Sequence, residues 1–109
     1  AQFHGLSRDK FCRAMGAEVI PCGGGYQEQY NDGLLDEAIA SRGFQRLFPA
    51  ERLKAYRDSF QELKGNKQVC ETTVGMFQTL LLADRRDVDH ILDAVRRIQA
   101  HSAELAKLA

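Results

Sequence analysis

The chain has 109 residues, of which 44% are hydrophobic and 28% are charged, and this composition is typical of one globular domain spanning residues 1–109. Fifteen Lys and Arg residues balance fifteen Asp and Glu residues, so no net charge attracts nucleic acid or an anionic membrane surface. No apolar run approaches the roughly 20 residues of a membrane helix and no secretory signal opens the sequence, so we expect a cytoplasmic protein without nucleic-acid or membrane partners.

The first part of the chain predicts a helix and a short strand. Ser7 is a good N-cap, Leu6 before it can pack against Phe11, and apolar residues follow at helical spacing, which predicts a helix over residues 8–17. Residues 18–22, EVIPC, are typical of a short strand. The proline in this segment confines the strand to a sheet edge or to its own end, because proline donates no ladder hydrogen bond.

The middle of the chain predicts a loop followed by two helices. Residues 23–25 form the only glycine cluster, and two tyrosines in a polar setting follow it, which indicates a loop. Asp32 can cap a short amphipathic helix that Gly43 ends. Apolar residues then repeat every three or four positions and predict a second amphipathic helix, closed at residues 64–65. Residues 65–68 are the only plausible linker.

The last third of the chain predicts a buried strand and a long helix. Residues 69–74 suggest one or two helical turns, and the nearly continuous apolar run over residues 76–82, MFQTLLL, predicts a central strand covered on both sides. Asp84 is a good N-cap for a long amphipathic helix that runs to the C-terminus. Together these elements predict the α/β (α+β) class, with a small sheet flanked by helices and a long C-terminal helix.

The glycine cluster and its tyrosines are candidates for binding. Glycines let backbone N–H groups approach a phosphate closely, but a P-loop requires Lys and Ser or Thr after the last glycine, and here Tyr26 follows. A flexible or tightly turned loop is the simpler interpretation. Tyr26 and Tyr30 could hydrogen-bond a polyhydroxy substrate or stack on a ring, or they could be half buried under the loop.

The sequence predicts neither a disulfide framework nor a metal site. Three cysteines form an odd set without a CxxC pair, which favours buried thiols over a disulfide framework or a zinc finger: Cys12, Cys22 and Cys70. Three histidines lie far apart and lack metal-ligand spacing, so no catalytic dyad is predicted either: His4, His90 and His101.

Two segments carry a series of motifs in a fixed order. Residues 7–30, SRDKFCRAMGAEVIPCGGGYQEQY, join an Arg-Asp helix to a Pro-containing strand and a Gly-Tyr loop through Arg8, Asp9, Ile20, Pro21, Gly25 and Tyr26. Residues 66–105, NKQVCETTVGMFQTLLLADRRDVDHILDAVRRIQAHSAEL, contain a QxxLLx motif and a final helix, here Gln78, Leu81, Leu82, Asp87, Asp89, Arg97, Ile98 and Gln99. In this order they resemble the C-terminal end of the DegT/DnrJ/StrS family of sugar and cyclitol aminotransferases.

The resemblance implies the small C-terminal domain of a type I pyridoxal-phosphate-dependent aminotransferase that is active as a homodimer. It implies transfer of an amino group from glutamate or glutamine to a keto sugar or cyclitol ketone, with pyridoxal phosphate held by a large domain. Relatives carry the Schiff-base lysine in a Ser/His-rich segment, and none of the five lysines has such surroundings: Lys10, Lys54, Lys64, Lys67 and Lys107. We therefore predict that this chain has no catalytic residue, binds no cofactor by itself and is inactive alone.

The resemblance also names candidate substrate-binding residues. Gly25, Tyr26 and Tyr30 match the loop that edges the substrate pocket in relatives, and Gln78 matches a recurrent position whose role could be structural. Three positions depart from the family pattern. Val19 replaces a glycine that ends the first helix in relatives, so a left-handed residue there is strained unless the helix stops earlier. Gly75 replaces a bulky aromatic residue and Ala83 replaces a glycine.

A second hypothesis is a stand-alone α/β interaction module that binds a partner through its terminal helix or apolar strand. Exposed apolar surface distinguishes the two hypotheses. A domain cut from a larger enzyme leaves a hydrophobic patch where the missing domain packs, whereas an independent module is polar apart from one compact site.

Overall fold

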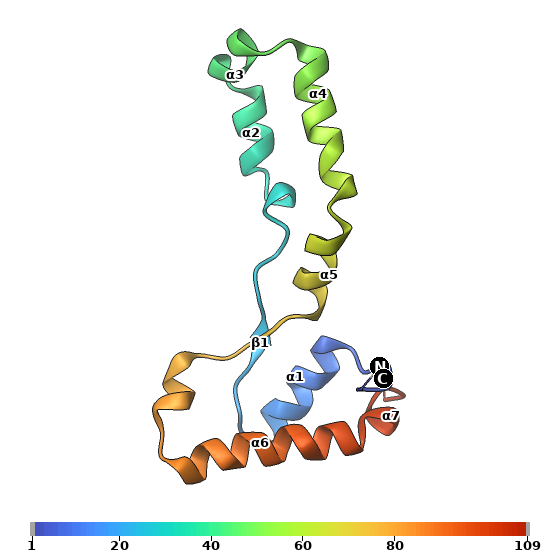
Figure 1. Ribbon diagram of the computed structural model, residues 1–109, viewed down its shortest axis with the longest axis vertical. Coiled ribbons are helices and arrows are strands. Elements are labelled where there is room, and N and C mark those ends of the chain that lie inside the picture. The colour runs from blue at the N-terminus through green and yellow to red at the C-terminus, as the bar shows by residue number, and fades with distance from the viewer. Residues whose placement is uncertain (1, 109) are drawn as a thin grey trace. The chain divides into compact units, whose positions relative to one another are not determined.

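The computed structural model describes residues 2–108, which divide into two compact units (Figure 1). The terminal unit consists of Ala1–Gly25 and Thr72–Ala109, and the inserted unit consists of Tyr26–Glu71. The two ends of the insertion adjoin a two-stranded antiparallel ribbon in which β1 (Gly23–Gly24) pairs with β2 (Val74–Gly75). In the register of this ribbon, Gly23 lies opposite Gly75 and Gly24 lies opposite Val74.

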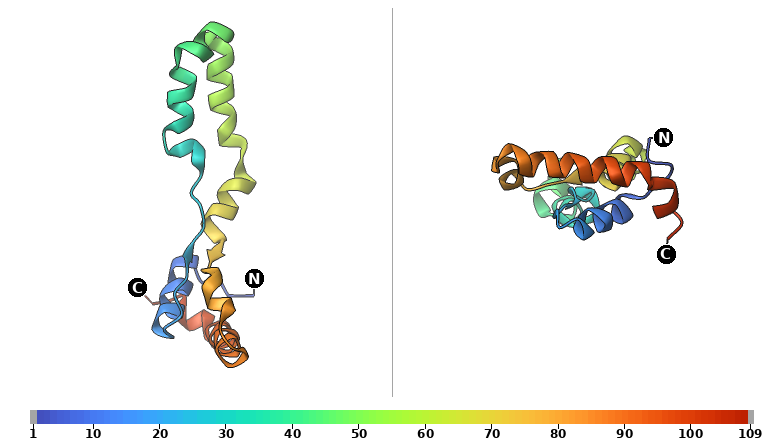
Figure 2. Two further views of the ribbon diagram at one scale, coloured as in Figure 1. Left: turned by 90° about the vertical axis from the view of Figure 1, so that its left-hand side faces the viewer. Right: turned by 90° about the horizontal axis from the view of Figure 1, so that it is seen from below.

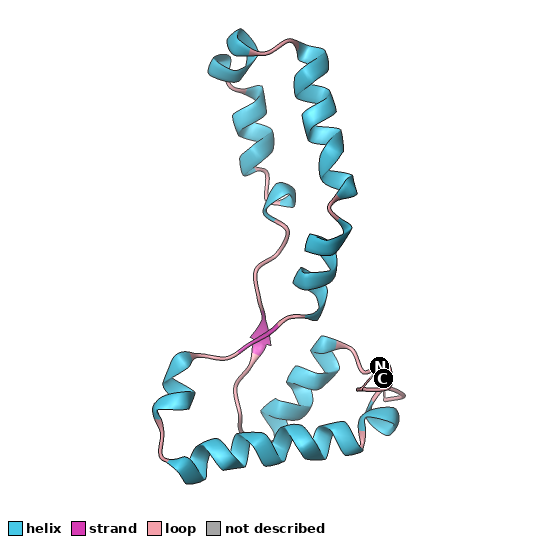
Figure 3. Cartoon of the chain, viewed as in Figure 1, coloured by secondary structure: helices cyan, strands magenta, loops and turns pink. Residues whose placement is uncertain are grey.

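Residues 2–108 are mostly helical and contain only this small sheet, so the predicted mixed class with a small sheet is confirmed in its coarse form (Figure 3). The long C-terminal helix is also confirmed. Helix α6 (Arg85–Ala100) begins where predicted, because the Asp84 carboxylate accepts a hydrogen bond from the backbone N–H of Asp87 at 3.1 Å. The helix breaks at His101 and a last turn, α7 (Ser102–Leu105), follows.

Helix α1 (Arg8–Ala17) has the predicted bounds, and the Ser7 hydroxyl caps it by accepting from the backbone N–H of Lys10 at 3.3 Å. Its C-terminus forms a Schellman motif. The backbone N–H of Ile20 donates to the carbonyl of Met15, and that of Val19 donates to the carbonyl of Gly16, each at 3.0 Å. Val19 therefore adopts the left-handed conformation, with φ of +63°, and the helix does not stop early to avoid this strain.

The core of the terminal unit lies between α1 and α6, which pack side by side in both views (Figures 1 and 2). Met15 and Ile20, at the end of α1, contact Ala94 and Ile98 of α6, and all four side chains are buried. The hydrophobic contact between Met15 and Ile20 is the one that accompanies a Schellman motif. The Schellman turn thus directs the chain out of α1 and into the core.

Two predicted strands in the terminal unit were wrong. Residues 18–20 complete the Schellman turn, so the strand begins only at Gly23. Residues 76–82 were predicted as a central strand, but β2 ends at Gly75 and Gln78–Leu82 form the 3-10 helix η3. No strand among the described residues lies beside this segment, so its backbone bonds locally, as from the N–H of Leu80 to the carbonyl of Phe77 at 3.0 Å.

The inserted unit is a set of short helices. They are the 3-10 helix η1 (Gln29–Asn31), α2 (Leu34–Ala40), α3 (Arg42–Leu47), α4 (Ala50–Ser59), the 3-10 helix η2 (Phe60–Glu62) and α5 (Lys64–Thr72). The predicted cap of α2 by Asp32 was wrong by one residue, because Gly33 is the N-cap and Asp32, just before it, accepts from the backbone N–H of Leu34 at 3.0 Å. The predicted stop at Gly43 was wrong because Ser41 ends α2 and its hydroxyl caps α3, which contains Gly43. The predicted linker over residues 65–68 was also wrong, because it lies within α5.

The buried residues of the inserted unit are few and largely aromatic. Tyr30, Leu53 and Phe60 form its buried set. The Phe60 ring packs against Tyr30 and Tyr56, with ring centroids 5.6 and 4.9 Å apart. This cluster holds the end of α4 and the start of η2 against η1, because aromatic pairs at these separations attract beyond their burial.

Candidate functional site

The glycine segment runs as extended chain and does not curl around an anion site. Among the described glycines, positive φ angles occur only at Gly5 and Gly33, which lie outside the cluster. A Cβ added to Gly24 would lie 2.9 Å from the Arg8 Nη1 atom, so a side chain at this position would displace the guanidinium. The cluster therefore serves close approach between β1 and α1, and the helix-opening geometry of a P-loop is lacking.

The four predicted substrate-binding residues lie in different environments. Tyr26 follows Gly25 directly, and its side chain is 86% exposed. Gly25 lies beside Thr73, because a Cβ added to Gly25 would lie 3.4 Å from the Cγ2 atom of Thr73. Tyr30 is buried against Phe60, so its ring serves the aromatic cluster of the inserted unit. Gln78 is an exposed residue at the start of η3. Gly25 and Tyr26 are thus both exposed, whereas the ring of Tyr30 is buried.

The lysines of the chain do not fit a pyridoxal-phosphate site. Lys10 donates to the carbonyl oxygens of Ala106 and Leu108 and so caps the end of α7. Lys54 is paired with Asp58 on α4 at 2.5 Å, and its side chain is 76% exposed. Lys64 and Lys67 lie on exposed positions of α5, and Lys107 is exposed in the turn that follows α7. A Schiff-base lysine is instead desolvated beside donors that hold the cofactor phosphate, and these five lysines lack such surroundings.

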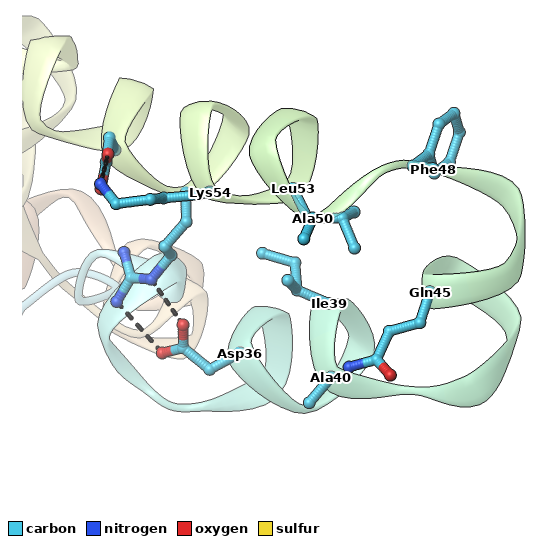
Figure 4. Close-up of a pocket in the computed structure, with 10 residues that line it drawn as sticks. Asp36, Ile39, Ala40, Gln45, Phe48, Ala50, Leu53 and Lys54 are labelled. Atoms are coloured by element: carbon cyan, nitrogen blue, oxygen red, sulfur yellow. Dashed lines mark hydrogen bonds and ion pairs between the residues drawn. The ribbon is translucent and has the colours of Figure 1, made fainter.

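A groove between helices of the inserted unit is a site that sequence reasoning missed. It has a volume of about 630 Å³ and is lined from α2, α3 and α4. Its apolar lining points inward in the close-up, with Ile39 of α2 opposite Ala50 and Leu53 of α4 (Figure 4). Asp36 and Arg57 also line the groove and are paired by two hydrogen bonds. The one signal in the sequence was the helical spacing of the apolar residues, which does not tell which helices meet.

The chemistry of this groove is that of an apolar contact surface. The Arg57 guanidinium donates Nε to Asp36 Oδ1 at 2.5 Å and Nη2 to Oδ2 at 3.1 Å, so both charges are neutralised. Lys54 pairs with Asp58 through a single contact, from Nζ to Oδ2. The groove holds no cysteine, serine or histidine in its lining, so no activated nucleophile faces it.

A serine and a histidine meet in the terminal unit, but not as a catalytic pair. Ser102 is fully buried, and its hydroxyl donates to the carbonyl of Gln99 at 2.7 Å. That bond uses the only hydroxyl hydrogen, so His4 Nδ1, which lies 2.9 Å from the same oxygen, must be the donor. A general base must accept the proton of its nucleophile, and His4 cannot do so here. The pair ties the N-terminal segment to α7.

Two thiols also meet in the terminal unit. Cys12 and Cys22 are both partly buried free thiols, and Cys12 is close enough to Cys22 to influence its pKa. Burial, the hydrogen bond and the charge of Cys12 together raise the pKa of the Cys22 thiol to about 11. Within residues 2–108, no three potential ligands from His, Cys, Asp and Glu gather closely enough to hold a metal ion.

Comparison of the chain with protein-family models, with curated proteins and with solved structures finds no match. Across the part of the chain that the structure describes, no helix has the length and apolar character needed to cross a membrane.

Proposed function

We propose that this chain is the non-catalytic small-domain part of a pyridoxal-phosphate-dependent sugar aminotransferase of the DegT/DnrJ/StrS type, working in the cytoplasm as a homodimer. In this proposal a large domain holds the cofactor, which supplies the electron sink when bound. The amino group passes from glutamate or glutamine to a keto sugar or cyclitol ketone. This chain contributes packing surface and one edge of the substrate pocket.

One observation supports the packing role above all others. Large apolar side chains gather on η3 and the residue before it, where Phe77 is 76% exposed and Leu82 is 73% exposed, with Leu81 also exposed. Burial of one such side chain is worth about 1.5 to 3 kcal/mol. A cluster left in water is therefore typical of a surface that another protein body covers.

The position of this cluster supports a fixed docking surface. Met76, one residue before Phe77, packs against the core of the terminal unit, and Leu80 within η3 is half buried. The segment thus has an inner side held by the core and an outer side of exposed residues. A surface anchored in this way is preorganised, so its docking costs little conformational entropy.

The exposed side chain of Tyr26 supports the substrate role. A tyrosine hydroxyl can donate and accept hydrogen bonds, which suits the hydroxyl groups of a sugar. Tyr26 is free of the aromatic packing that buries Tyr30. We assign Tyr26 the substrate contact, and we assign Tyr30 the support of the inserted unit that begins at Tyr26.

The test uses two proteins side by side, the 109-residue chain and the polypeptide encoded by the complete reading frame from which it comes. Cofactor binding is measured by absorbance, and amino transfer from glutamate or glutamine to keto sugars is measured by mass spectrometry of the amino-sugar product. We expect both properties in the longer polypeptide and neither in the chain alone. A reading frame that encodes no cofactor domain with a Schiff-base lysine would overturn the proposal. The second hypothesis, a stand-alone interaction module, would then be the one to test.

The role of Tyr26 is tested in the longer polypeptide. Tyr26→Phe removes one hydroxyl and should raise KM for the sugar with little change in KM for the amino donor. Tyr56→Phe is the matched control, because Tyr56 is half exposed and packs on Phe60. If the wild-type protein and Tyr26→Phe had the same KM for the sugar, Tyr26 would not be a substrate-binding residue.

A further inference from the structure

A smaller hollow of the inserted unit lies between α3 and α4. It has a volume of about 210 Å³, and we call it the aromatic pocket after the five residues that line it: Phe44, Phe48, Arg52, Leu53 and Tyr56. Phe44 belongs to α3, Phe48 is the C-cap of that helix, and the other three residues belong to α4. All five lie within the inserted unit, so one compact body forms the pocket.

The local sequence explains why these residues share one pocket. Phe44 and Phe48 are four residues apart, so their side chains are neighbours, with ring centroids 6.0 Å apart. Arg52 and Tyr56 are likewise four residues apart on α4. Pro49, which has no backbone N–H to continue α3, is the N-cap of α4 and separates the two pairs. The pocket is therefore set by the sequence around a single turn.

The lining of the aromatic pocket is apolar except for one guanidinium. Leu53 is buried, and the rings of Phe44 and Tyr56 are partly exposed. The Arg52 Cζ atom lies 5.0 Å from the centroid of the Phe48 ring, and this cation–π contact holds the guanidinium beside the pocket. Within residues 2–108, no carboxylate forms an ion pair with Arg52.

This unpaired charge distinguishes the aromatic pocket from the neighbouring groove. In the groove, Asp36 pairs with Arg57, and Lys54 pairs with Asp58. The guanidinium of Arg52 instead keeps its N–H donors available in a planar fork, which matches the two oxygens of a carboxylate. An apolar pocket with one unpaired positive group fits an apolar ligand group that has a carboxylate beside it.

The size of the aromatic pocket indicates that one side chain fills it. Pockets for small molecules have volumes of roughly 300 to 1,000 Å³, and the aromatic pocket, at about 210 Å³, is smaller. Apolar surface also extends beyond it, because Leu47, three residues from Phe44 on α3, is 74% exposed. Protein interfaces have this arrangement, in which one anchoring side chain fills a pocket and further contacts surround it.

We propose that the aromatic pocket is the docking site for an acidic segment of a partner protein. The segment inserts one bulky apolar side chain between Phe44 and Tyr56, and it places an Asp or Glu carboxylate on the Arg52 guanidinium. The apolar side chain supplies affinity, and the carboxylate fixes the orientation because it binds a planar fork. The pocket takes no part in the sugar reaction proposed above, so the chain alone is sufficient for the test.

Two other occupants fit the charge of the pocket less well. An anionic membrane surface attracts clusters of roughly four to eight basic residues, and the aromatic pocket has one. A second copy of the chain that used the same patch around a two-fold axis would bring two Arg52 guanidinium groups together, and like charges repel. An acidic segment of another protein instead pairs with the unpaired charge.

The test measures the binding of the 109-residue chain to an array of fluorescently labelled helical peptides by anisotropy. Each peptide of the first set has one central Phe, Trp, Leu, Ile or Met, and Asp or Glu occupies in turn each position within one helical turn on either side. Two matched sets replace the central residue by Ala or the acidic residues by Lys. We expect peptides of the first set alone to bind, and we expect added salt to weaken their binding because exposed charges attract each other.

Variants of Arg52 test the carboxylate contact. Arg52→Glu should weaken the binding of the best peptides about tenfold or more, and Arg52→Gln should weaken it by a smaller factor. Arg46→Glu is the matched control, because Arg46 lies on α3 and lines neither the groove nor the aromatic pocket. It makes the same change of charge and should alter binding by less than about twofold at physiological ionic strength. Arg46 and Arg52 are exposed, so all three variants should keep the circular dichroism of the wild-type chain.

Five results would overturn the proposal. Three of them concern the peptides: no binding by any peptide of the first set, equal binding by the wild-type chain and Arg52→Glu, or equal weakening by Arg52→Glu and Arg46→Glu. The fourth is sedimentation of the chain with vesicles of phosphatidylserine and phosphatidylcholine that Arg52→Glu abolishes, which would assign the pocket to a membrane surface. The fifth is self-association of the wild-type chain that Arg52→Glu abolishes, which would assign the pocket to a second copy.

Discussion

Arg57 and Asp36 join α4 to α2 through a two-pronged ion pair, with Nε 2.5 Å from Oδ1 and Nη2 3.1 Å from Oδ2. The same guanidinium lies over the Phe60 ring, 5.4 Å from its centroid. A fork of this geometry is stronger than a single-point ion pair, and the aromatic ring adds a second attraction. Arg57 therefore links the aromatic cluster of the inserted unit to the lining of its groove.

We expect Arg57→Ala to lower the free energy of unfolding by about 1 kcal/mol, since both partners are partly exposed and solvent screens the pair. Arg57→Lys keeps the charge but loses the two-bond geometry, so its loss of stability should be smaller than that of Arg57→Ala but not zero. Urea denaturation measures the free energy of unfolding of both variants. Lys54→Ala is the control, because its pair with Asp58 is largely exposed and its removal should change stability by less than about 0.5 kcal/mol. Equal losses for Arg57→Ala and Lys54→Ala would contradict a special role for the fork.

Replacement of Val19 by glycine should stabilise the chain. Val19 holds a left-handed backbone at φ of +63°, which is costly for a β-branched residue, and its side chain is 87% exposed. We expect Val19→Gly to raise the free energy of unfolding by about 1 kcal/mol, after the greater chain entropy of glycine is subtracted. Ala17→Gly, two residues earlier but inside the helix, should lower it by a similar amount. Thermal unfolding of the two variants should therefore move in opposite directions.

The stability of the reduced chain should fall at alkaline pH because of Cys22. The pKa of this thiol rises from 9.0 to about 11 in the folded protein, first through burial and then through Cys12. The folded state therefore holds the proton more tightly than the unfolded state does. The resulting stability is fully present below about pH 9 and is lost as the pH rises toward 11.

The measurement is urea denaturation between pH 8 and 11, as the difference between the wild-type chain and Cys22→Ala under a phosphine reductant. Subtraction removes the contributions of lysines and tyrosines, which titrate over the same range. The difference in free energy of unfolding between the wild-type chain and Cys22→Ala should shrink as the pH rises. Cys70→Ala should follow the wild-type curve, and a Cys22→Ala curve parallel to the wild type would contradict the prediction.

Ser102→Ala should destabilise the terminal unit. The buried hydroxyl donates to Gln99 and accepts from His4, so its removal leaves two hydrogen bonds unmade. We expect a loss of about 1 to 2 kcal/mol in the free energy of unfolding. A double-mutant cycle with His4→Ala isolates the His4–Ser102 bond, and its coupling energy should be about 0.5 to 1.5 kcal/mol. Strict additivity of the two substitutions would show that the bond does not contribute in solution.

The sequence by itself determined the elements whose signals are local. Ser7 and Asp84 were predicted as helix caps, and each accepts a hydrogen bond from a backbone N–H three residues later. A cap bond of this kind forms within one turn of chain, so its donor and acceptor are both visible in a short stretch of sequence. The bounds of α1 and the start of α6 follow for the same reason.

The secondary structure of the apolar run over residues 76–82 was decided only by the tertiary structure. The same holds for the contacts of the candidate site residues. A short apolar run becomes a strand only where a neighbouring strand takes its backbone hydrogen bonds, and β2 ends before the run begins. The burial of Tyr30 depends on Phe60, thirty residues further along the chain, and the Cys12–Cys22 pair depends on the reversal at Val19. Such contacts join residues that no helical or strand period relates, so physical packing alone brings them together.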